Sequence, residues 1–538
     1  MSNVKEISVG TVLWRVAGAV AVLVVALLPA VTVSHYSLDE FDEAYQMLNC
    51  ADYRNTPLAP LSALIGGLYC SLTGWSLLAA RYYALGCVAL AVICSTVWFW
   101  RRTHRYGLTL AVGGVCLFLA TIYRSTHITF SWDNLTLLSA VLIAIAFAAW
   151  LRRPCPAFTA ALAALTAFAV LVRVPNVVFI MPVTLGLIVF RPEGGRRWWT
   201  APVYFLLTAV LLCIGLVSLY GSPGVWTDAL AANPIGSHDS YQIFSKSPPL
   251  FMHLLPGAAL MWVGYHLLVR ARGRRGLTFV LAVLFMAMMY FYLKQRTINV
   301  EYIFLMFMGL AVGAVVYYDR SRLLSGHSAT AIFIFFIALA PCAGSNTLLI
   351  KAVIWPMMPL LAAMYLPHIT TPGRVFVPVM TFCFVAFAYS NVRYGALTGS
   401  GLFQNMDETT ARIPEGRLAG IVTTPAQAGF VMALQTDVRA ATADGSELLV
   451  LRRYGQDYLW EYLFDARNPY LRHSFDYNDC QADPDYIAQV RTRVALPGAR
   501  TVLFMRPEHR VLTPMQEMLD SQMTRAVVEP RYIIYKKQ

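Results

Sequence analysis

The chain has 538 residues, of which 58% are hydrophobic and only 13% are charged. This composition excludes an ordinary soluble domain, and apolar runs of roughly 17–23 residues recur from Val12 to Tyr389, each long enough to cross about 30 Å of hydrocarbon. The formal charge of +13 does not indicate a nucleic-acid surface, because the basic clusters are dispersed between the apolar runs, as in cytoplasmic loops.

The charge distribution predicts a topology. Residues 391–538 hold 17 basic and 17 acidic side chains, so residues 1–390 carry the whole excess. If every basic cluster is cytoplasmic, the first span (12–33) runs outward from a cytoplasmic N-terminus, and it is too long for the core of a signal peptide. The other spans are predicted at 76–100, 107–123, 135–151, 157–172, 177–190, 201–220, 254–269, 277–293, 302–318, 328–343, 348–366 and 374–390. The predicted fold is therefore an all-α polytopic membrane protein of about 13 transmembrane helices, with an external C-terminal tail.

An acidic external loop, 34–75, follows the first span. It holds five of the twelve acidic residues in 1–390, including Asp42 and Glu43. Carboxylates at a bilayer face are costly and indicate a functional site, although a solvated loop is the alternative. Asp39-Glu40 repeats the pair three residues upstream, so either Asp39 or Asp42 is a candidate base. Residues 58–72 are short and Pro/Gly-containing, and they predict an interfacial helix on the outer surface.

Later external loops add a carboxylate and several cations. Asp133, in Ser131-Trp-Asp-Asn134, is either a site residue or a helix N-cap. The external cations include Arg54, Arg81, Arg173, Lys294 and Arg296, which are suited to phosphate but also to snorkelling toward lipid headgroups.

A polar external loop and two external cysteines are further candidates for a role at the site. The polar loop 221–253 contains His238-Asp239, which favours a turn over a metal site, and we expect this loop to border the site cavity. Cys50 and Cys480 are both external on this topology, and a disulfide between them is one option.

The tail, 391–538, predicts a separate soluble domain. Short apolar runs of strand length occur at 447–452, 500–505 and 531–535, and helix-like stretches lie between them at 425–436 and 514–523. This alternation predicts a small α/β domain. We expect it to serve as a lid or as a platform for the acceptor.

The acidic loop also resembles a known family. Asp42-Glu-Ala-Tyr45, then Thr56-Pro-Leu58, Leu72-Thr-Gly-Trp-Ser76 and Ala79-Ala-Arg81 are similar to a block of the C-type glycosyltransferase superfamily. The likeness is to its aminoarabinose transferase and protein O-mannosyltransferase branch, and it extends in pattern over residues 10–310. The resemblance implies a 13-span enzyme with an external C-terminal domain. One departure is that Asn55-Thr56 stands where the branch has a Lys before its Pro pair, a place that Arg54 would have to fill.

The implied chemistry transfers a sugar from a polyprenyl phosphate to an acceptor hydroxyl. The hydroxyl must lose its proton during attack, and we assign Asp42 as that base. By resemblance, Glu43 orients the acceptor, Asp42 or a divalent metal ion, although an acid at a helix N-terminus is an equal alternative. Asp133 resembles a second site residue.

Basic and aromatic residues complete the predicted site. Arg54, Arg81, Arg173, Lys294 and Arg296 are the predicted ligands of the donor phosphate. Tyr45, Tyr302 and His238 are the predicted substrate contacts. No cofactor is firmly implied.

The predicted function is a membrane glycosyltransferase that acts on a lipid, glycan or protein acceptor of the envelope, with the bacterial inner membrane as its location and a periplasmic site. Two other classes stay open. A transporter or flippase predicts repeated halves or broken spans with midplane charges, and the sequence shows neither. A non-catalytic assembly factor leaves the carboxylate block without a use.

Overall fold

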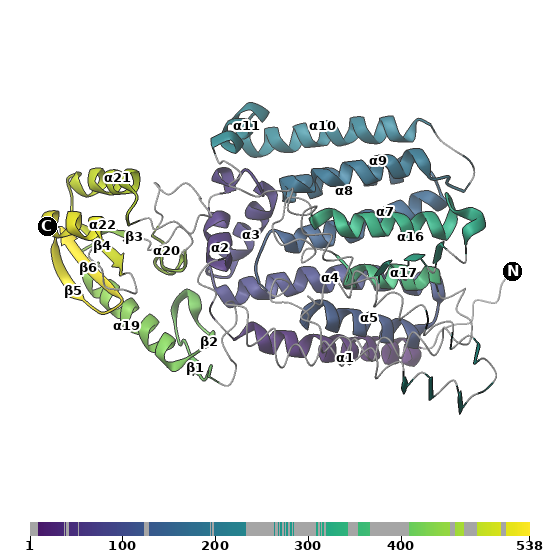
Figure 1. The fold of residues 1–538 in the computed structure, drawn as a ribbon, viewed down its shortest axis with the longest axis horizontal. Coiled ribbons are helices and arrows are strands. Elements are labelled where there is room, and N and C mark those ends of the chain that lie inside the picture. Colours follow the sequence, from purple (N-terminus) through teal and green to yellow (C-terminus); the bar gives the residue numbers. More distant parts are fainter. Residues whose placement is uncertain are drawn as a thin grey trace.

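The computed structural model describes residues 9–36, 38, 42–51, 53–122, 129–193, 195, 198–232, single residues between 263 and 316, 319–342, 353–365, 408–451, 458–466, 481–506 and 513–537. This part is mostly helical, with two small sheets near the C-terminus. The helices form a bundle, and the C-terminal residues form a smaller α/β unit at one end of it (Figure 1).

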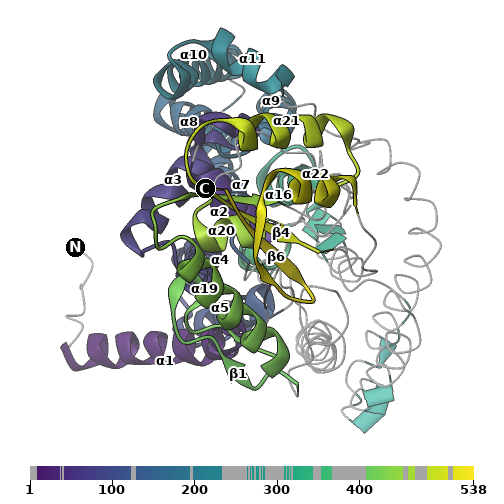
Figure 2. The same cartoon turned by 90° about the vertical axis from the view of Figure 1, so that its left-hand side faces the viewer.

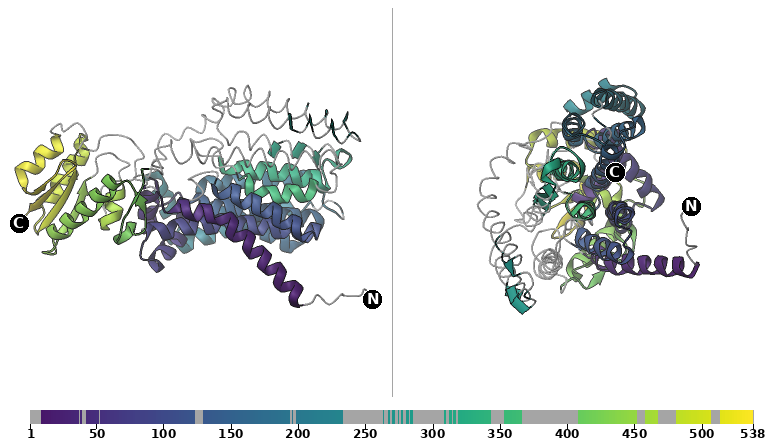
Figure 3. Two further views of the ribbon diagram at one scale, coloured as in Figure 1. Left: turned by 90° about the horizontal axis from the view of Figure 1, so that it is seen from below. Right: turned by 90° about the vertical axis from the view of Figure 1, so that its right-hand side faces the viewer.

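The bundle helices run roughly side by side, as Figures 1 and 3 show. Four of the described helices are long and apolar enough to cross a membrane: α1, α4, α7 and α10. The bounds of the bundle helices are α1 (Val9–Ser34), α4 (Leu77–Thr103), α5 (Tyr106–Ile122), α7 (Asp133–Arg152), α8 (Pro156–Val172), α9 (Ile180–Val189), α10 (Thr200–Tyr220), α16 (Gly326–Leu339) and α17 (Met358–Tyr365). The helices predicted at α1, α4, α5, α7, α8, α10 and α16 are confirmed, whereas α9 and α17 begin within the stretches predicted at 177–190 and 348–366. The spans predicted at 254–269, 277–293, 302–318 and 374–390 lie wholly or largely outside the described residues.

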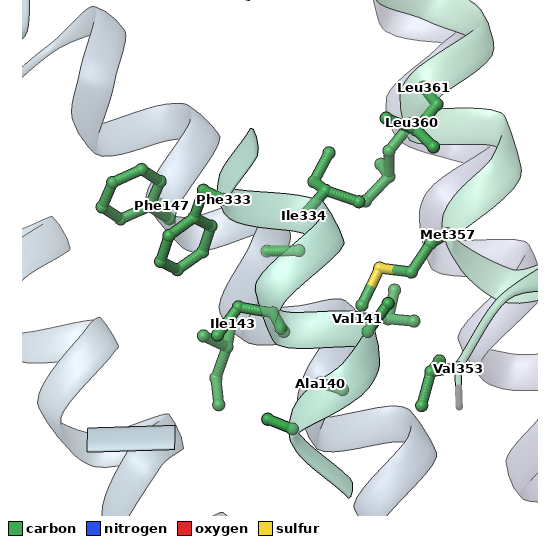
Figure 4. Packing of buried hydrophobic residues seen from close by; sticks show 14 of the residues in the cluster. Ala140, Val141, Ile143, Phe147, Phe333, Ile334, Val353, Met357, Leu360 and Leu361 are labelled. Carbon is green, nitrogen blue, oxygen red and sulfur yellow. The ribbon is translucent and has the colours of Figure 1, made fainter. Parts of the chain in front are cut away.

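Helix α7 lies at the centre of the bundle. It packs against α4, α8 and α16, and 78% of its most apolar stretch is buried, compared with 11% in α1 and in α10. Phe147 of α7 stacks on Phe333 of α16 with ring centroids 3.6 Å apart (Figure 4). The exposed apolar faces of α1 and α10 suit contact with lipid, where a helix satisfies its own backbone hydrogen bonds.

Prolines shorten two predicted spans. The stretch predicted at 177–190 begins with the 3₁₀ turn η2 (Val174–Phe179), which has Pro175 in its first turn, and α9 starts only at Ile180. In the stretch predicted at 348–366, η6 (Trp355–Met357) with Pro356 precedes α17. Proline lacks the N–H group and fixes φ, so it favours such a start over a continuous helix.

Two short helices lie across the end of the bundle, between it and the C-terminal unit (Figure 1). Helix α2 (Asp42–Ala51) lies within the acidic loop, and η1 (Tyr53–Asn55) follows it. Glu43 stands in the first turn of α2, which agrees with the alternative of an acid at a helix N-terminus. Helix α3 (Pro60–Leu72) occupies the stretch predicted as an interfacial helix. Pro60 stands in its first turn, and Gly74 and Trp75 end it with φ values of 65° and 59°. A residue in the left-handed region stops a helix.

A glycine allows α2 and α3 to pack closely. A Cβ atom at Gly67 would lie 2.3 Å from the carbonyl oxygen of Cys50, whereas one at Gly86 of α4 would meet nothing within 4 Å. We expect Gly67→Ala to destabilise the protein by about 1–3 kcal/mol through overpacking. Gly86→Ala is the matched control and should be neutral or slightly stabilising. Thermal unfolding in detergent checks both, and equal midpoints for the two variants would contradict the close approach.

The C-terminal unit is built around a four-stranded sheet in the order β3-β4-β6-β5. Strands β3 (Glu447–Leu451) and β4 (Arg500–Met505) are parallel, and β6 (Tyr532–Lys537) is antiparallel to both β4 and β5 (Thr524–Val528). The other elements are β1 (Ala411–Arg412), β2 (Val422–Thr423), α19 (Pro425–Ala441), α20 (Leu459–Phe464), α21 (Pro484–Ala495) and α22 (Pro514–Gln522). The three strands and two helices predicted in the tail are confirmed, whereas β5, α20 and α21 were not predicted.

Both faces of this sheet are buried. Alternate residues such as Leu503 and Ile534 pack with α19, and their neighbours Val502 and Ile533 pack with α21 and α22. This is the period of two that strands impose on side chains. The face that packs with α19 also joins the bundle end, because one apolar cluster contains residues of α2, α4, α19 and α20.

Candidate functional site

A buried ion pair fixes the start of α2. Arg81, in the first turns of α4, donates from Nε to Glu43 Oε1 (2.9 Å) and from Nη2 to Oε2 (2.5 Å). Its Nη1 donates to the carbonyl oxygens of Ser34 (2.8 Å) and Tyr36 (3.1 Å). The same guanidinium group therefore joins the end of α1, the start of α2 and α4.

This pair is sealed from solvent. The exposed fraction is 0% for Glu43 and 1% for Arg81. The backbone N–H of Phe130 also donates to Glu43 Oε1 (3.4 Å), so the loop before α7 meets the same carboxylate. A buried pair gains only when its remaining donors and acceptors are satisfied, as the arginine's are here. Asp42, the preceding residue, begins α2, so the pair sets the position of its backbone.

A second ion pair lies at the same end of the bundle. Arg173, which follows α8, has Nε 3.5 Å from Asp133 Oδ1, and its Nη1 donates to the carbonyl oxygen of Pro341 at 3.0 Å. Arg173 is buried, whereas the side chain of Asp133 is 26% exposed. Asp133 is the first residue of α7, and the N-cap position of that helix belongs to Trp132. The N-cap alternative is therefore wrong, and Asp133 presents a partly exposed carboxylate.

Direct contacts connect the two pairs. The rings of Tyr45 in α2 and Trp132, next to Asp133, meet edge to face at 6.1 Å. The N–H of Val174, next to Arg173, donates to the carbonyl oxygen of Leu58 at 2.8 Å. The structure therefore gathers the start of α2, Asp133 and Arg173 at one end of the bundle, from residues far apart in sequence.

The C-terminal unit packs directly onto this end, and Figure 2 views the molecule from that side. The Tyr458 ring lies 4.9 Å from that of Tyr45. Tyr462 donates its hydroxyl to the carbonyl oxygen of Trp75, and burial raises the pKa of Tyr462 well above its ordinary value, which keeps it a neutral donor. The backbone N–H of Val422 donates to the carbonyl oxygen of His35 at 2.6 Å.

One arginine is central to this interface. The Arg417 guanidinium lies over the rings of Trp75 (5.8 Å) and Tyr462 (5.4 Å), and it donates to the Tyr462 carbonyl at 2.6 Å. We expect Arg417→Ala to loosen the C-terminal unit, seen as faster hydrogen exchange in residues 458–466. Arg439→Ala is the matched control, because Arg439 pairs with Glu415 on an exposed surface, where an ion pair contributes little. Equal exchange in the two variants would contradict an anchoring role for Arg417.

A small polar pocket lies between α2 and α3. Gln46, Asn49, Thr56 and Ser62 contribute to its lining, and its volume of about 10 Å³ is roughly that of one water molecule. The side-chain amide of Asn49 is buried and has no hydrogen-bond partner among the described residues. A water molecule would satisfy that amide.

Two thiols lie close to this pocket. Cys50 and Cys70 are buried free thiols, and burial raises the pKa of Cys70 to about 12. Because Cys50 is free, the disulfide considered between Cys50 and Cys480 is not formed in this structure, and Cys480 itself lies outside the described residues.

No family model and no curated protein matches the chain. The fold resembles that of ArnT. Two crystal structures of ArnT from Cupriavidus metallidurans each match over 98% of both chains: the form bound to undecaprenyl phosphate, at 14% identity and a TM-score of 0.42, and the apo form, at 15% and 0.41. Likeness at this level concerns the fold, and we infer nothing about the reaction from it.

The predicted catalytic residues and the predicted ligands of the donor phosphate differ in their burial and in their contacts. Glu43 and Arg81 contact each other, and Asp133 and Arg173 contact each other. Arg54 is exposed, with its guanidinium 5.9 Å from the Tyr53 ring. Arg81 therefore has a carboxylate as its partner where the sequence predicted a phosphate. Asp42 is described by its backbone alone, and Asp39, Lys294 and Arg296 lie outside the described residues.

Of the three predicted substrate contacts, only Tyr45 lies within the described residues. Tyr45 is 5% exposed and lies in the interface with the C-terminal unit. His238 and Tyr302 lie outside the described residues, so their roles stay predictions. In the part of the chain that the structure describes, no group of three or more His, Cys, Asp or Glu could hold a metal ion.

Sequence reasoning missed several residues of this end. Asn49, Tyr458, Tyr462 and Arg417 were not singled out. The available signal was aromatic content, since Tyr458, Trp460 and Tyr462 alternate along a helix-forming stretch of the tail. Such a stretch also suits an ordinary core, so the sequence did not distinguish an interface from packing.

Proposed function

We propose that this protein is a membrane glycosyltransferase, which moves a sugar from a polyprenyl-phosphate donor to an acceptor of the cell envelope. The observation that supports this most is the meeting of the acidic start of α2 with the Asp133–Arg173 pair at one end of an apolar helical bundle. Carboxylates and guanidinium groups at one membrane face suit interfacial chemistry on a lipid phosphate.

In the proposed reaction, the acceptor hydroxyl attacks the anomeric carbon and the bond from that carbon to the phosphate oxygen breaks. Asp42 takes the hydroxyl proton, and the polyprenyl phosphate leaves as the anion. We assign Arg173, which contacts the Pro341 carbonyl and Asp133, as the cation that stabilises the charge on that phosphate, and Arg54 on η1 as a second one. Glu43 and Arg81 act as positioning residues for the start of α2.

The proposed topology places this end outside the cytoplasm. We propose about 13 transmembrane helices, a cytoplasmic N-terminus and a periplasmic C-terminal unit in a bacterial inner membrane, because this arrangement puts the Arg clusters of the opposite helix ends in the cytoplasm. The C-terminal unit then covers the site from the periplasm. Its contacts with α2 and with Trp75 support a role as a platform for the acceptor.

The test uses the purified full chain in liposomes. It is incubated with a panel of radiolabelled polyprenyl-phosphate sugars and a bacterial membrane extract, and label that leaves the lipid fraction is measured. The proposal expects one donor in the panel to be consumed and its label to appear on a lipid, glycan or protein. Movement of an intact labelled donor between leaflets, without loss of label, would contradict it and favour a flippase.

A further inference from the structure

A cavity of about 230 Å³ lies at the end of the bundle opposite the C-terminal unit. The last turns of α4 and α7 and the first turn of α16 line it, and the right panel of Figure 3 views this end. These helix ends are remote from the site, because Leu77 and Asp133 begin α4 and α7 at the other end. Nothing in the proposed reaction uses this cavity.

Three arginines line the cavity. Arg102 lies in the last turn of α4, Arg152 ends α7, and Arg322 lies in η3 (Arg320–Arg322). Among the described residues, none of these three makes an ion pair within 4 Å. A guanidinium group is a planar fork of N–H donors that suits a phosphate, so three of them around one cavity indicate an anionic ligand.

Two carboxylates also line the cavity, but they do not balance the arginines. Asp319 accepts a hydrogen bond from the backbone N–H of Ser328 (3.3 Å), and the Ser328 hydroxyl donates to its carbonyl, so it holds the first turn of α16. The backbone N–H of Glu193 donates to the Leu151 carbonyl at 2.8 Å, and its carboxylate attracts Arg152 without an ion pair within 4 Å among the described residues. His327 is the remaining titratable residue of the lining. With His327 neutral, the lining keeps a net positive charge.

The rest of the wall is mostly apolar, and the hydroxyl of Thr330, its one other polar side chain, donates to the Gly326 carbonyl. Leu151 and Met364 are buried, and the Trp98 ring lies 4.7 Å below the Arg102 guanidinium. Tryptophan is typical of the membrane–water boundary, and basic pockets between transmembrane helices bind lipid headgroups. A phosphate alone would leave the apolar wall without a contact, whereas a lipid would use both parts.

We propose that this cavity binds the headgroup of an anionic glycerophospholipid, with the phosphate on the arginines and the glycerol and upper acyl carbons on the apolar wall. The proposal does not depend on the transferase activity. On the proposed topology, the lipid belongs to the cytoplasmic leaflet.

The test measures lipid retention by the purified full chain in detergent. Phosphatidylglycerol or phosphatidylcholine is added, and native mass spectrometry counts the bound lipid. We expect wild type to prefer phosphatidylglycerol, and Arg102→Gln/Arg152→Gln to bind it at least about tenfold more weakly. Arg322→Gln changes a residue outside the bundle helices, and it should also weaken the binding of phosphatidylglycerol.

The matched control is Arg101→Gln/Arg153→Gln, which removes the same charge from neighbouring exposed residues that do not line the cavity. It should retain phosphatidylglycerol as wild type does, and thermal unfolding without added lipid should be alike for all variants. Equal loss in both double variants, or no loss in either, would overturn the proposal. Binding of inorganic phosphate as tightly as the lipid would also overturn it, because the apolar wall would then contribute nothing.

Discussion

Replacing Asp42 by asparagine is expected to lower the rate of sugar transfer by at least about 100-fold, because removal of a general base typically costs that much or more. Asparagine keeps the size of the side chain and can still start a helix, so α2 and the Glu43–Arg81 pair should persist. Donor binding should therefore change little, and the loss should fall on kcat. Single-turnover measurement of label released from the donor checks this.

Asp39→Asn is the matched control for that experiment, because Asp39-Glu40 repeats the acidic pair in the same loop. We expect it to retain most of the activity. The reverse result, with Asp39→Asn inactive and Asp42→Asn active, would move the base three residues upstream and contradict the assignment of Asp42.

Breaking the Glu43–Arg81 pair is expected to have the largest effect on stability. Glu43→Leu or Arg81→Met alone leaves one buried charge without its partner, which typically costs about 3–5 kcal/mol. The double variant should be more stable than either single variant, because no buried charge is left. A double-mutant cycle on the unfolding free energy in detergent measures this coupling.

The control for the cycle is Arg525 with Asp520 in the C-terminal unit. The side chain of Arg525 is 42% exposed and that of Asp520 is 27% exposed. Arg525→Ala should therefore lower the free energy of unfolding by no more than about 1 kcal/mol. A Glu43–Arg81 coupling as small as that of the exposed pair would contradict the role of the buried pair in holding α1, α2 and α4 together.

Much of the fold could be predicted from the sequence. Hydrophobic length predicted the helices of the bundle, such as α4 and α7, and alternating apolar residues predicted β3, β4 and β6. These signals are local, because a span or a strand is determined mainly by its own residues. Pro175 and Pro356 are also local signals, because each marks a late start of a helix. A hydrophobicity average over a window of residues conceals them.

The pairing of the site residues could not be predicted in the same way. Arg81 and Arg173 were predicted as ligands of the donor phosphate. Glu43 was predicted to orient the acceptor, Asp42 or a metal ion, and Asp133 was predicted as a second site residue, so neither pairing was expected. Each pair joins residues about 40 apart, and no periodicity reports such a contact. One physical signal was present: a lone arginine in the first turns of an apolar span requires a partner. The acidic residues of the preceding loop were the nearest candidates.

The central claim is that the donor phosphate binds at the bundle end covered by the C-terminal unit, and photocrosslinking tests it most directly. A polyprenyl-phosphate sugar with a photoreactive group next to its phosphate is bound to the full chain and irradiated, and the labelled peptides are sequenced. We expect labels within 42–58, 129–134 and 173–176. Labels confined to the opposite cavity, around Arg102, Arg152 and Arg322, would contradict the placement of the site.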